Sequence, residues 1–382
     1  LRRGSKYSLA FVGVLFLLAV LATPVVSAAN PFGANHRVND DLGTAVQQRV
    51  AAVADSSGNV YAAWQDARNG DFDIYFARST DGGRTFGPSQ RLGGDRAVGT
   101  AQERPAIALG PKGEIVIVWQ DDRLTYMDYD IFATVSYDRG TTFASPVRVD
   151  DGASGAIEFA PSVAVDSAGT TYVTWQESRS GNGDVRLARG TLSPLHFGAS
   201  VRVDDDVAGA GTQASPSVVV GSLGTVFVAY HDNRTGDANV YLAKSTNGGA
   251  SFGPSIRVDD TGASATAQGL VSLAIDSLDN LFAVWQDARN GNGDFDIYFA
   301  SSTDGGRSFS RNIRVDDGPR GSSQTSPRIA VGMAGTLYVA WHDERNTDTD
   351  IYFSYSVDGG ATFASSIRVD DAGDSVTDPA PQ

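Results

Sequence analysis

One motif recurs along most of the chain and restricts the folds that the chain can adopt. The motif has the form S-x-D-x-G-x-T-F, and its aligned phenylalanines follow one another at intervals of 57, 54, 55, 57 and 54 residues: Phe86, Phe143, Phe197, Phe252, Phe309 and Phe363. A second motif, W-Q-D-x-R, keeps the same spacing, with its aromatic residue at Trp64, Trp119, Trp175, Tyr230, Trp285 and Trp341. Six tandem copies at this period indicate a propeller or another repeat array.

Each repeat contains four short stretches that are typical of β-strands. In the second repeat they are separated by turn-forming residues and lie at 105–109, 115–119, 130–134 and 146–149. The second stretch is apolar on both faces, as in a sheet that is covered on both sides. Four-stranded antiparallel sheets repeated about an axis form a β-propeller. The sequence therefore predicts an all-β fold, a six-bladed β-propeller of four-stranded antiparallel blades.

The two ends of the chain lie outside the repeats. Residues 1–28 combine early basic residues, an apolar stretch at 9–22 and small residues up to Ala28, a pattern that predicts a cleaved signal peptide. The apolar stretch is shorter than the roughly 20 residues of a bilayer-spanning helix, which favours removal over a retained anchor. We expect a lead-in segment at 29–46, the propeller at 47–371, a C-terminal tail at 372–382, and a secreted, extracellular or periplasmic protein.

Charge and cysteine content exclude several functions. The formal net charge is −15, and it becomes −18 when the basic residues of the signal peptide, Arg2, Arg3 and Lys6, are removed. This charge argues against nucleic acid and against an anionic membrane surface as partners. The chain has no cysteine, so disulfides, thiolate metal sites and a cysteine nucleophile are excluded.

The first motif resembles the Asp-box, or BNR repeat, of sialidase-like β-propellers. Five copies match well, at 79–86, 136–143, 245–252, 302–309 and 356–363, whereas the third copy, GTLSPLHF at 190–197, keeps only the Phe. The resemblance covers residues 36–371 and implies a structural turn, in which Asp and Ser/Thr side chains bond the backbone and Gly supplies an unusual φ. Sialidases use an arginine cluster, a Tyr–Glu pair and an Asp. Their F/Y-R-I-P motif is absent, the nearest sequence being Glu103-Arg-Pro-Ala106.

Strand alternation places the W-Q-D-x-R segments at the end of the ring opposite the Asp-box turns, where we expect any ligand site. Each arginine of this motif follows a carboxylate by two residues, and a planar guanidinium suits a brace between two acceptors. A ligand-binding role is the alternative, with Arg123 and Arg179 as candidates. The loops at 69–73 and 290–296 carry oxygen ligands without the spacing of a known calcium loop. We expect no cofactor or metal, with Ca²⁺ as the alternative.

A catalytic site should break the symmetry of the repeats. Ahead of each first strand the aligned residue is a neutral amide in five repeats and a carboxylate, Glu158, in the third, where Glu177 also replaces Asp. The second repeat has an aromatic loop with Tyr126 and Tyr129, and extra arginines occur near first strands at Arg49, Arg104 and Arg328. We interpret Glu158, Tyr126 and Glu177 as candidate catalytic residues, with Glu158 in an axial opening ringed by amides. The candidate ligand-binding residues are Arg104, Arg49, Tyr129, Arg123 and Arg179. Drift among repeats is the alternative.

Three functions follow from these features. The uniform blades favour a secreted, non-catalytic propeller that binds a glycan or a cell-surface ligand. The resemblance and the asymmetric residues favour an exo-glycosidase of sialidase type, which removes a terminal sialic acid or a related acidic sugar. The third is a structural exported protein. The sequence leaves the oligomeric state open.

The closure of the ring has two solutions, because two copies of the outer strand compete for blade six: 37–40 and 368–371. We expect the C-terminal copy to pair there, since short local connections cost least chain entropy. The N-terminal copy should then lie beside blade one, and deleting 30–41 should leave the melting temperature nearly unchanged.

Overall fold

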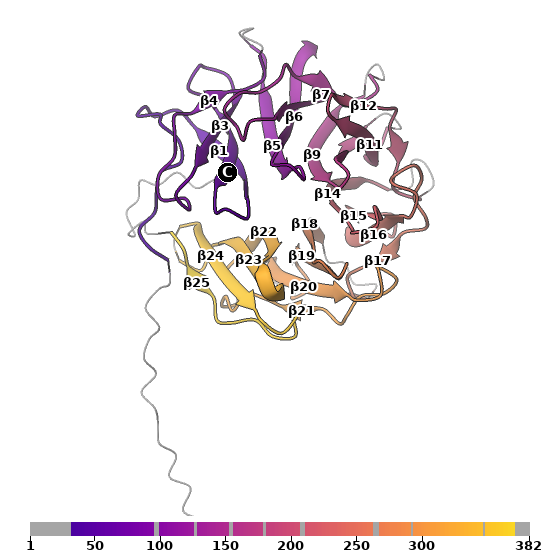
Figure 1. Ribbon diagram of the computed structural model, residues 1–382. Coiled ribbons are helices and arrows are strands. Elements are labelled where there is room, and N and C mark those ends of the chain that lie inside the picture. Colours follow the sequence, from indigo (N-terminus) through magenta and orange to yellow (C-terminus); the bar gives the residue numbers. More distant parts are fainter. Residues whose placement is uncertain are drawn as a thin grey trace, which may run out of the picture. The chain divides into compact units, whose positions relative to one another are not determined.

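The structure is a computed structural model, which describes residues 32–94, 99–125, 128–152, 156–178, 181–206, 211–262, 267–291, 293–346 and 348–370. The described part of the chain forms six antiparallel sheets in a ring, which confirms the predicted six-bladed β-propeller (Figure 1). In five sheets the four strands follow one another in sequence order, and the third sheet has a fifth strand, with both β12 and β13 paired to β11. The only helix among these residues is a short 3-10 turn, η1 (Met333–Gly335). None of the described segments is a helix long and apolar enough to cross a membrane.

The first three blades contain thirteen strands. Blade 1 comprises β1 (Gln47–Ala54), β2 (Val60–Asp66), β3 (Asp73–Ser79) and β4 (Gln90–Arg91). Blade 2 comprises β5 (Gln102–Leu109), β6 (Ile115–Thr125), β7 (Asp128–Ser136) and β8 (Val147–Arg148). Blade 3 comprises β9 (Glu158–Val165), β10 (Thr170–Glu177), β11 (Asp184–Leu192), β12 (Leu195–Phe197) and β13 (Val201–Arg202). Its fifth strand, β12, forms a hairpin with β11 where the third motif copy has lost its Asp.

The last three blades have four strands each. Blade 4 comprises β14 (Gln213–Val220), β15 (Val226–Asp232), β16 (Asn239–Ser245) and β17 (Ile256–Arg257). Blade 5 comprises β18 (Gln268–Ile275), β19 (Leu281–Asp287), β20 (Asp296–Ser302) and β21 (Ile313–Arg314). Blade 6 comprises β22 (Gln324–Val331), β23 (Leu337–Asp343), β24 (Asp350–Ser356) and β25 (Ile367–Arg368).

The hydrophobic core lies between neighbouring blades. Second strands are apolar on both faces because each sheet is covered on both sides, and Trp119, Trp175, Trp285 and Trp341 are almost completely buried. Five buried clusters each combine side chains of two successive blades, from blades 1 and 2 through blades 5 and 6. A sixth places Val38 of the lead-in segment against Trp64 and Tyr75 of blade 1. Among the described residues, no such cluster joins blade 6 to blade 1.

The S-x-D-x-G-x-T-F turns contain the hydrogen bonds that were predicted for them. In blade 1 the Asp81 carboxylate accepts bonds from Ser79 Oγ at 2.7 Å and from the Thr85 backbone N–H at 2.9 Å. A bond from Thr85 Oγ1 at 2.7 Å, followed by these two, holds the pKa of Asp81 well below its usual range. Gly360, with φ 90°, lies so close to Phe299 of the preceding blade that an added Cβ would be 2.2 Å from the ring. The turn therefore also serves blade-to-blade packing.

The outer-strand copies occupy the places that were predicted. The C-terminal copy forms β25 and pairs with β24, which completes blade 6. The N-terminal copy lies against blade 1, where Asp40 accepts bonds from Arg68 Nη1 at 2.7 Å and from the Ser89 backbone N–H at 2.9 Å.

Asp40 belongs to a series of aspartates that reach from one blade to the next, which we call the latch aspartates: Asp40, Asp205, Asp260 and Asp317. The last three pair with the W-Q-D-x-R arginine of the following blade at 2.7, 2.7 and 2.8 Å. Each also accepts a backbone N–H just before that blade's fourth strand, at 2.8, 3.0 and 3.0 Å. At the corresponding position after β4 the chain has Gly94, so blade 1 offers no carboxylate there.

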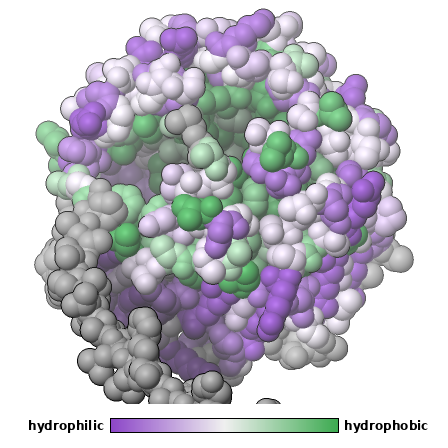
Figure 2. Space-filling model, turned by 60° about the horizontal axis from the view of Figure 1, so that its bottom comes forward, coloured by the Kyte–Doolittle hydropathy of each residue, from purple (hydrophilic) through white to green (hydrophobic). Residues whose placement is uncertain are grey.

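The surface mixes polar and apolar residues on the face seen in Figure 2, with polar residues dense along its lower rim. The most exposed large apolar side chains, Leu42 and Leu223, belong to separate segments of the chain. Isolated exposed apolar residues of this kind are normal on a protein surface.

Candidate functional site

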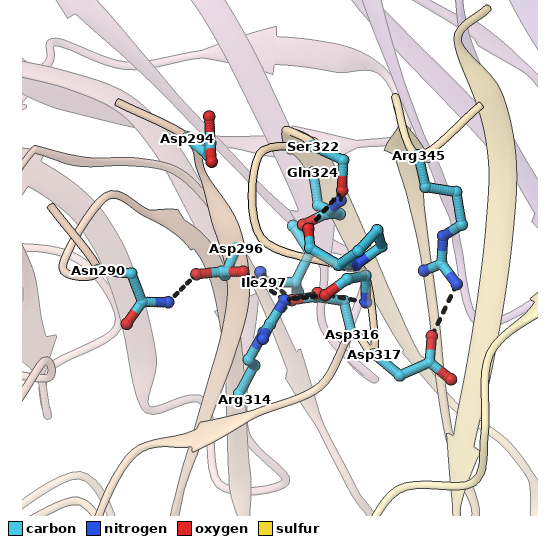
Figure 3. A network of polar contacts seen from close by, with 12 residues as sticks. Asn290, Asp294, Asp296, Ile297, Arg314, Asp316, Asp317, Ser322, Gln324 and Arg345 are labelled. Carbon is cyan, nitrogen blue, oxygen red and sulfur yellow. Dashed lines mark hydrogen bonds and ion pairs between the residues drawn. The ribbon is translucent and has the colours of Figure 1, made fainter. Parts of the chain in front are cut away.

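A network of charged and amide side chains recurs where the third and fourth strands of one blade meet the first strand of the next. Figure 3 shows it at blades 5 and 6. Arg314 pairs with Asp296 at 2.5 Å and with Asp316 at 2.6 Å. Two amides complete it: Asn290 donates to Asp296, and Gln324 donates to Ser322 Oγ at 2.8 Å. In this arrangement the carboxylate oxygens accept hydrogen bonds from an amide N–H and pair with one guanidinium.

The W-Q-D-x-R arginines act as braces beside this network, as predicted. Arg289 pairs with Asp287 at 2.7 Å and lies over the ring of Tyr298 at 3.9 Å from its centroid. Arg123, a candidate ligand-binding residue, pairs in the same way with Asp121 and lies over Phe132 at 4.4 Å. Its guanidinium is therefore already engaged within the blade. Arg179, the other candidate from this motif, lies outside the described residues.

Glu158 takes the place of the amide in the network between blades 2 and 3. Its side chain is fully buried, and among the described residues neither carboxylate oxygen has a hydrogen-bond partner. One oxygen of Glu158 lies within 4.8 Å of carboxylate oxygens of Asp130 and Asp150. The prediction that Glu158 faces an axial opening therefore differs from the structure, because its carboxylate is enclosed between two blades.

The surroundings of Glu158 disfavour its charged form. Burial is the main cause, and the nearby carboxylates of Asp150 and Asp130 add to it, so the pKa of Glu158 is raised to about 9. Burial and Asp150 also raise the pKa of Asp130 to about 6. Arg148, which pairs with Asp150 at 2.6 Å and also with Asp130, opposes both shifts only in part.

Glu177 and Glu158 face each other across the β9–β10 pair. In blades 5 and 6 the equivalent pairs combine Gln with Asp, and the amide donates to the carboxylate at 3.3 Å. Glu177 is buried and lies 3.3 Å from Arg186. Trp175 Nε1 has no acceptor among the described residues, whereas Trp285 donates to Asp287, the residue that corresponds to Glu177. Tyr126, the third candidate catalytic residue, lies outside the described residues.

The extra arginines lie on the first strands of blades 1, 2 and 6, and we call Arg49, Arg104 and Arg328 the arginine group. The Arg49 side chain is exposed. Burial is the main cause that lowers the pKa of Arg104 and of Arg328, and the positive charge of Arg49 lowers the pKa of both further. Within the described part of the chain, none of the three forms an ion pair. Arg49 and Arg104 are themselves bulge residues with positive φ, 55° and 52°. The same conformation recurs in every blade, two residues after the Gln or Glu that opens the first strand.

Tyr129 lies beside the arginine group. It acts electrostatically on Arg104, and its ring centroid lies 6.4 Å from that of Phe159 at the start of β9. His342 lies near Arg328, and burial followed by that positive charge lowers the pKa of His342. Arg49 and Tyr129 thus lie within electrostatic reach of Arg104, whereas the carboxylates of Glu158 and Glu177 are fully buried.

Two features of this region escaped the sequence analysis. Asp130 and Asp150 were not among the candidate residues, although Asp130 lies near the start of the third strand and Asp150 follows the fourth strand of blade 2, and both lie beside Glu158 at the start of blade 3. Leu124 stands where blades 1, 5 and 6 have Asn69, Asn290 and Asn346, each of which donates its amide to the carboxylate that opens the third strand. Comparison of the repeats position by position would have shown this second departure. In the loops at 69–73 and 290–296, which were considered for Ca²⁺, Asn69 and Asn290 already donate hydrogen bonds to the carboxylates of Asp73 and Asp296.

A separate groove of about 630 Å³ lies between blades 2 and 3 on the face of the Asp-box turns. Its lining includes Lys112, Glu114, Arg189 and His196, and the β11–β12 hairpin forms one wall. The loss of the third turn motif therefore has a structural consequence at this face.

No protein-family profile matches this sequence, and no curated protein matches it either. Similar solved structures include an α-L-arabinofuranosidase from Fusarium graminearum, with 11% identity and a TM-score of 0.60 over 85% of this chain and 98% of that one. An α-L-arabinanase from Penicillium chrysogenum has 14% identity and a TM-score of 0.57 over 81% and 93%. An intramolecular trans-sialidase from Ruminococcus gnavus has 11% identity and a TM-score of 0.52 over 78% and 90%. The chain therefore has the six-bladed β-propeller fold of sialidase-like proteins.

Proposed function

We propose that the protein is an exported glycan-binding propeller, and that the arginine group holds a carboxylate of an acidic sugar. The observation that carries this proposal is the absence of an ion pair at Arg49, Arg104 and Arg328 within the described residues. The formal net charge of the chain is −15, and the described W-Q-D-x-R arginines are all paired with carboxylates. Like-charged guanidiniums near one another favour an anionic ligand, and a planar guanidinium binds a carboxylate with two hydrogen bonds.

Neighbouring aromatic residues support a sugar as that ligand. Tyr129 and Phe159 lie next to Arg104 and offer ring faces beside the positive charge. Ligand sites typically combine apolar or aromatic walls with a few oriented polar groups. The solved structures with this fold that are named for their activity include a sialidase, an arabinanase and an ulvan lyase, which supports a carbohydrate as the ligand class.

Binding without hydrolysis is favoured over exo-glycosidase activity by the position of the carboxylates. A glycosidase needs acidic side chains that reach the scissile bond. Glu158 and Glu177 are fully buried, and Glu177 pairs with Arg186. Neither side chain meets a ligand at the arginine group from its position in the structure.

The test is binding of acidic and neutral oligosaccharides to the mature protein and to two arginine variants. We expect sialyllactose or oligogalacturonate to bind, neutral arabino-oligosaccharides to bind less, and Arg104→Gln to weaken acidic binding at least about tenfold, the usual effect of losing a charged hydrogen bond. Arg307→Gln, on the exposed Asp-box face, is the matched control.

Other outcomes would contradict the proposal in distinct ways. Release of product from a fluorogenic sialoside would favour the exo-glycosidase. Loss of binding in Arg189→Gln but not in Arg104→Gln would place the ligand in the groove at blades 2 and 3. A lack of binding and of hydrolysis across acidic glycans would favour the structural role.

A further inference from the structure

The network between blades 2 and 3 differs from its copies in a way that removes hydrogen-bond donors. At blades 5 and 6, Gln324 and Asn290 supply amide N–H groups to this network. The corresponding residues are Glu158 and Leu124, so one carboxylate is added and two amide donors are lost. Both changes occur at one junction: Glu158 places a carboxylate oxygen where an amide N–H would be, and Leu124 leaves Asp130 without the amide donor that blades 1, 5 and 6 supply.

The added carboxylate points into a cluster of oxygens. Glu158 is fully buried, and neither of its oxygens has a hydrogen-bond partner in the part of the chain that the structure describes. One of them lies within 4.8 Å of carboxylate oxygens of Asp130 and Asp150. Arg148 pairs with Asp130 and Asp150, so three carboxylates face one guanidinium. With all groups ionised, the cluster has a net charge of −2, which a single divalent cation neutralises.

A second cluster in blade 3 provides an internal comparison. Asp184, Asp204 and Asp206 also lie within 4.8 Å of one another. There Arg202 pairs with all three carboxylates, at 2.9, 2.5 and 2.5 Å. Every carboxylate of that cluster is therefore paired with the guanidinium, whereas the ion pairs of Arg148 within the described residues involve Asp130 and Asp150 and not Glu158.

We propose that Asp130, Asp150 and Glu158 form a binding site for a divalent cation, Ca²⁺ by preference, that joins blade 2 to blade 3. The donors are all carboxylate oxygens, which suit Ca²⁺ or Mg²⁺ and do not suit metals that select nitrogen or sulfur. Ca²⁺ binds oxygens at about 2.3–2.6 Å, so opposed ligands lie about 5 Å apart. The three oxygens lie within 4.8 Å of one another, which is inside this span. The titration separates Ca²⁺ from Mg²⁺, which demands near-ideal octahedral geometry.

The cation would act as a cross-link, because Asp130 and Asp150 belong to blade 2 and Glu158 opens blade 3. Its place is distinct from the arginine group, so the inference does not depend on the proposed glycan binding. At the junction of blades 5 and 6, Arg314 and the amides of Asn290 and Gln324 bond these polar groups instead.

The experiment measures cation binding by the mature protein after treatment with a chelator and removal of the chelator. Ca²⁺ and Mg²⁺ are titrated while the melting temperature is followed, and Tb³⁺ luminescence reports direct binding. We expect Ca²⁺ to raise the melting temperature saturably and Glu158→Gln to weaken Ca²⁺ binding more than about tenfold, as expected for loss of a ligand. Asp206→Asn is the control, because it lies in the second cluster, where Arg202 pairs with all three carboxylates. This variant should retain the response to Ca²⁺.

Leu124→Asn is a second, independent variant, because Leu124 is exposed and the substitution restores the amide of blades 1, 5 and 6. It should also weaken Ca²⁺ binding, whereas the exposed Leu278→Asn should not, and this pair decides the question if Glu158→Gln fails to fold. Equal responses of wild type and folded Glu158→Gln would overturn the site. No cation binding up to millimolar concentration would also overturn it and assign the cluster to a bound proton.

Discussion

Glu158 shows how one side-chain change alters the chemistry of a repeated position. Gln324, its counterpart in blade 6, donates an N–H to Ser322 and to Asp343. A carboxylate offers acceptors only, and it meets Glu177, Asp130 and Asp150, which are acceptors too. In the absence of a cation the group can remain buried only by keeping its proton, which is what its raised pKa expresses.

Because Glu158 keeps its proton, we predict that the free energy of unfolding varies with pH in a way that this one residue determines. The pKa of Glu158 is about 9 in the folded protein against 4.5 as its ordinary value, so the folded state binds this proton more tightly than the unfolded state. The resulting stabilisation is complete below about pH 4.5 and is lost as the pH rises toward 9. With chelator present, the wild type should lose more free energy of unfolding between pH 5 and 9 than Glu158→Gln does.

Denaturant unfolding at pH 5, 7 and 9 measures this difference. Because all other groups titrate in both proteins, the difference between the two curves isolates Glu158. Parallel curves would show that Glu158 is ionised throughout, and added Ca²⁺ should reduce the difference if the cation site is present.

At the scale of single elements, the glycine pairs of the Asp-box turns serve two different purposes. Gly359 and Gly360 both have positive φ, 72° and 90°. A Cβ on Gly359 would meet nothing within 4 Å, whereas one on Gly360 would lie 2.2 Å from Phe299. The first glycine is needed for backbone conformation alone, and the second is also needed for contact with the preceding blade.

This distinction predicts unequal effects of two matched substitutions. Gly359→Ala should cost about 1 kcal/mol, the usual penalty of a left-handed conformation for a residue with a Cβ. Gly360→Ala should cost about 1–3 kcal/mol more, because the core must also accommodate an overpacked methyl group. Thermal or chemical unfolding of both variants checks the prediction, and equal losses would show that Phe299 moves away freely.

The strands and their order could be predicted because the repeat period and the turn motifs report them directly. The strand predicted at 115–119 is the first part of β6, which stays buried to Asp122 and continues to Thr125. The direction of Glu158 could not be predicted in the same way. Alternation along β9 is interrupted by a bulge at Ala160, with φ 50°, and by a register shift opposite Thr174 and Gln176. Position at the start of an inner strand therefore did not reveal which side the carboxylate faces.

At the scale of the whole molecule, the latch aspartates change the expected role of the lead-in segment. Asp40 contacts Arg68 and Ser89, and Val38 packs on Trp64. A segment with these contacts contributes to stability, so the earlier expectation that its deletion leaves the melting temperature unchanged needs revision. We now expect removal of residues up to 41 to lower the melting temperature measurably.

Asp40→Ala tests the latch without removing the segment. Nearly half of the Asp40 side chain is exposed to solvent, which screens its ion pair with Arg68. We therefore expect a loss of about 1 kcal/mol in the free energy of unfolding, mainly from the hydrogen bonds to a charged group. Glu344→Ala, at an exposed side chain, is the control and should have no measurable effect. Equal stability of both variants would contradict a contribution from the latch.

The latches also have a direction along the chain. In each described case the aspartate precedes, in sequence, the blade whose arginine and backbone N–H it binds: Asp40 before blade 1, Asp205 before blade 4, Asp260 before blade 5 and Asp317 before blade 6. A polypeptide that emerges N-terminus first thus carries the anchor for every such blade before the blade itself is synthesised. Assembly by successive docking, each unit onto a partner already in place, is built into the order of the residues.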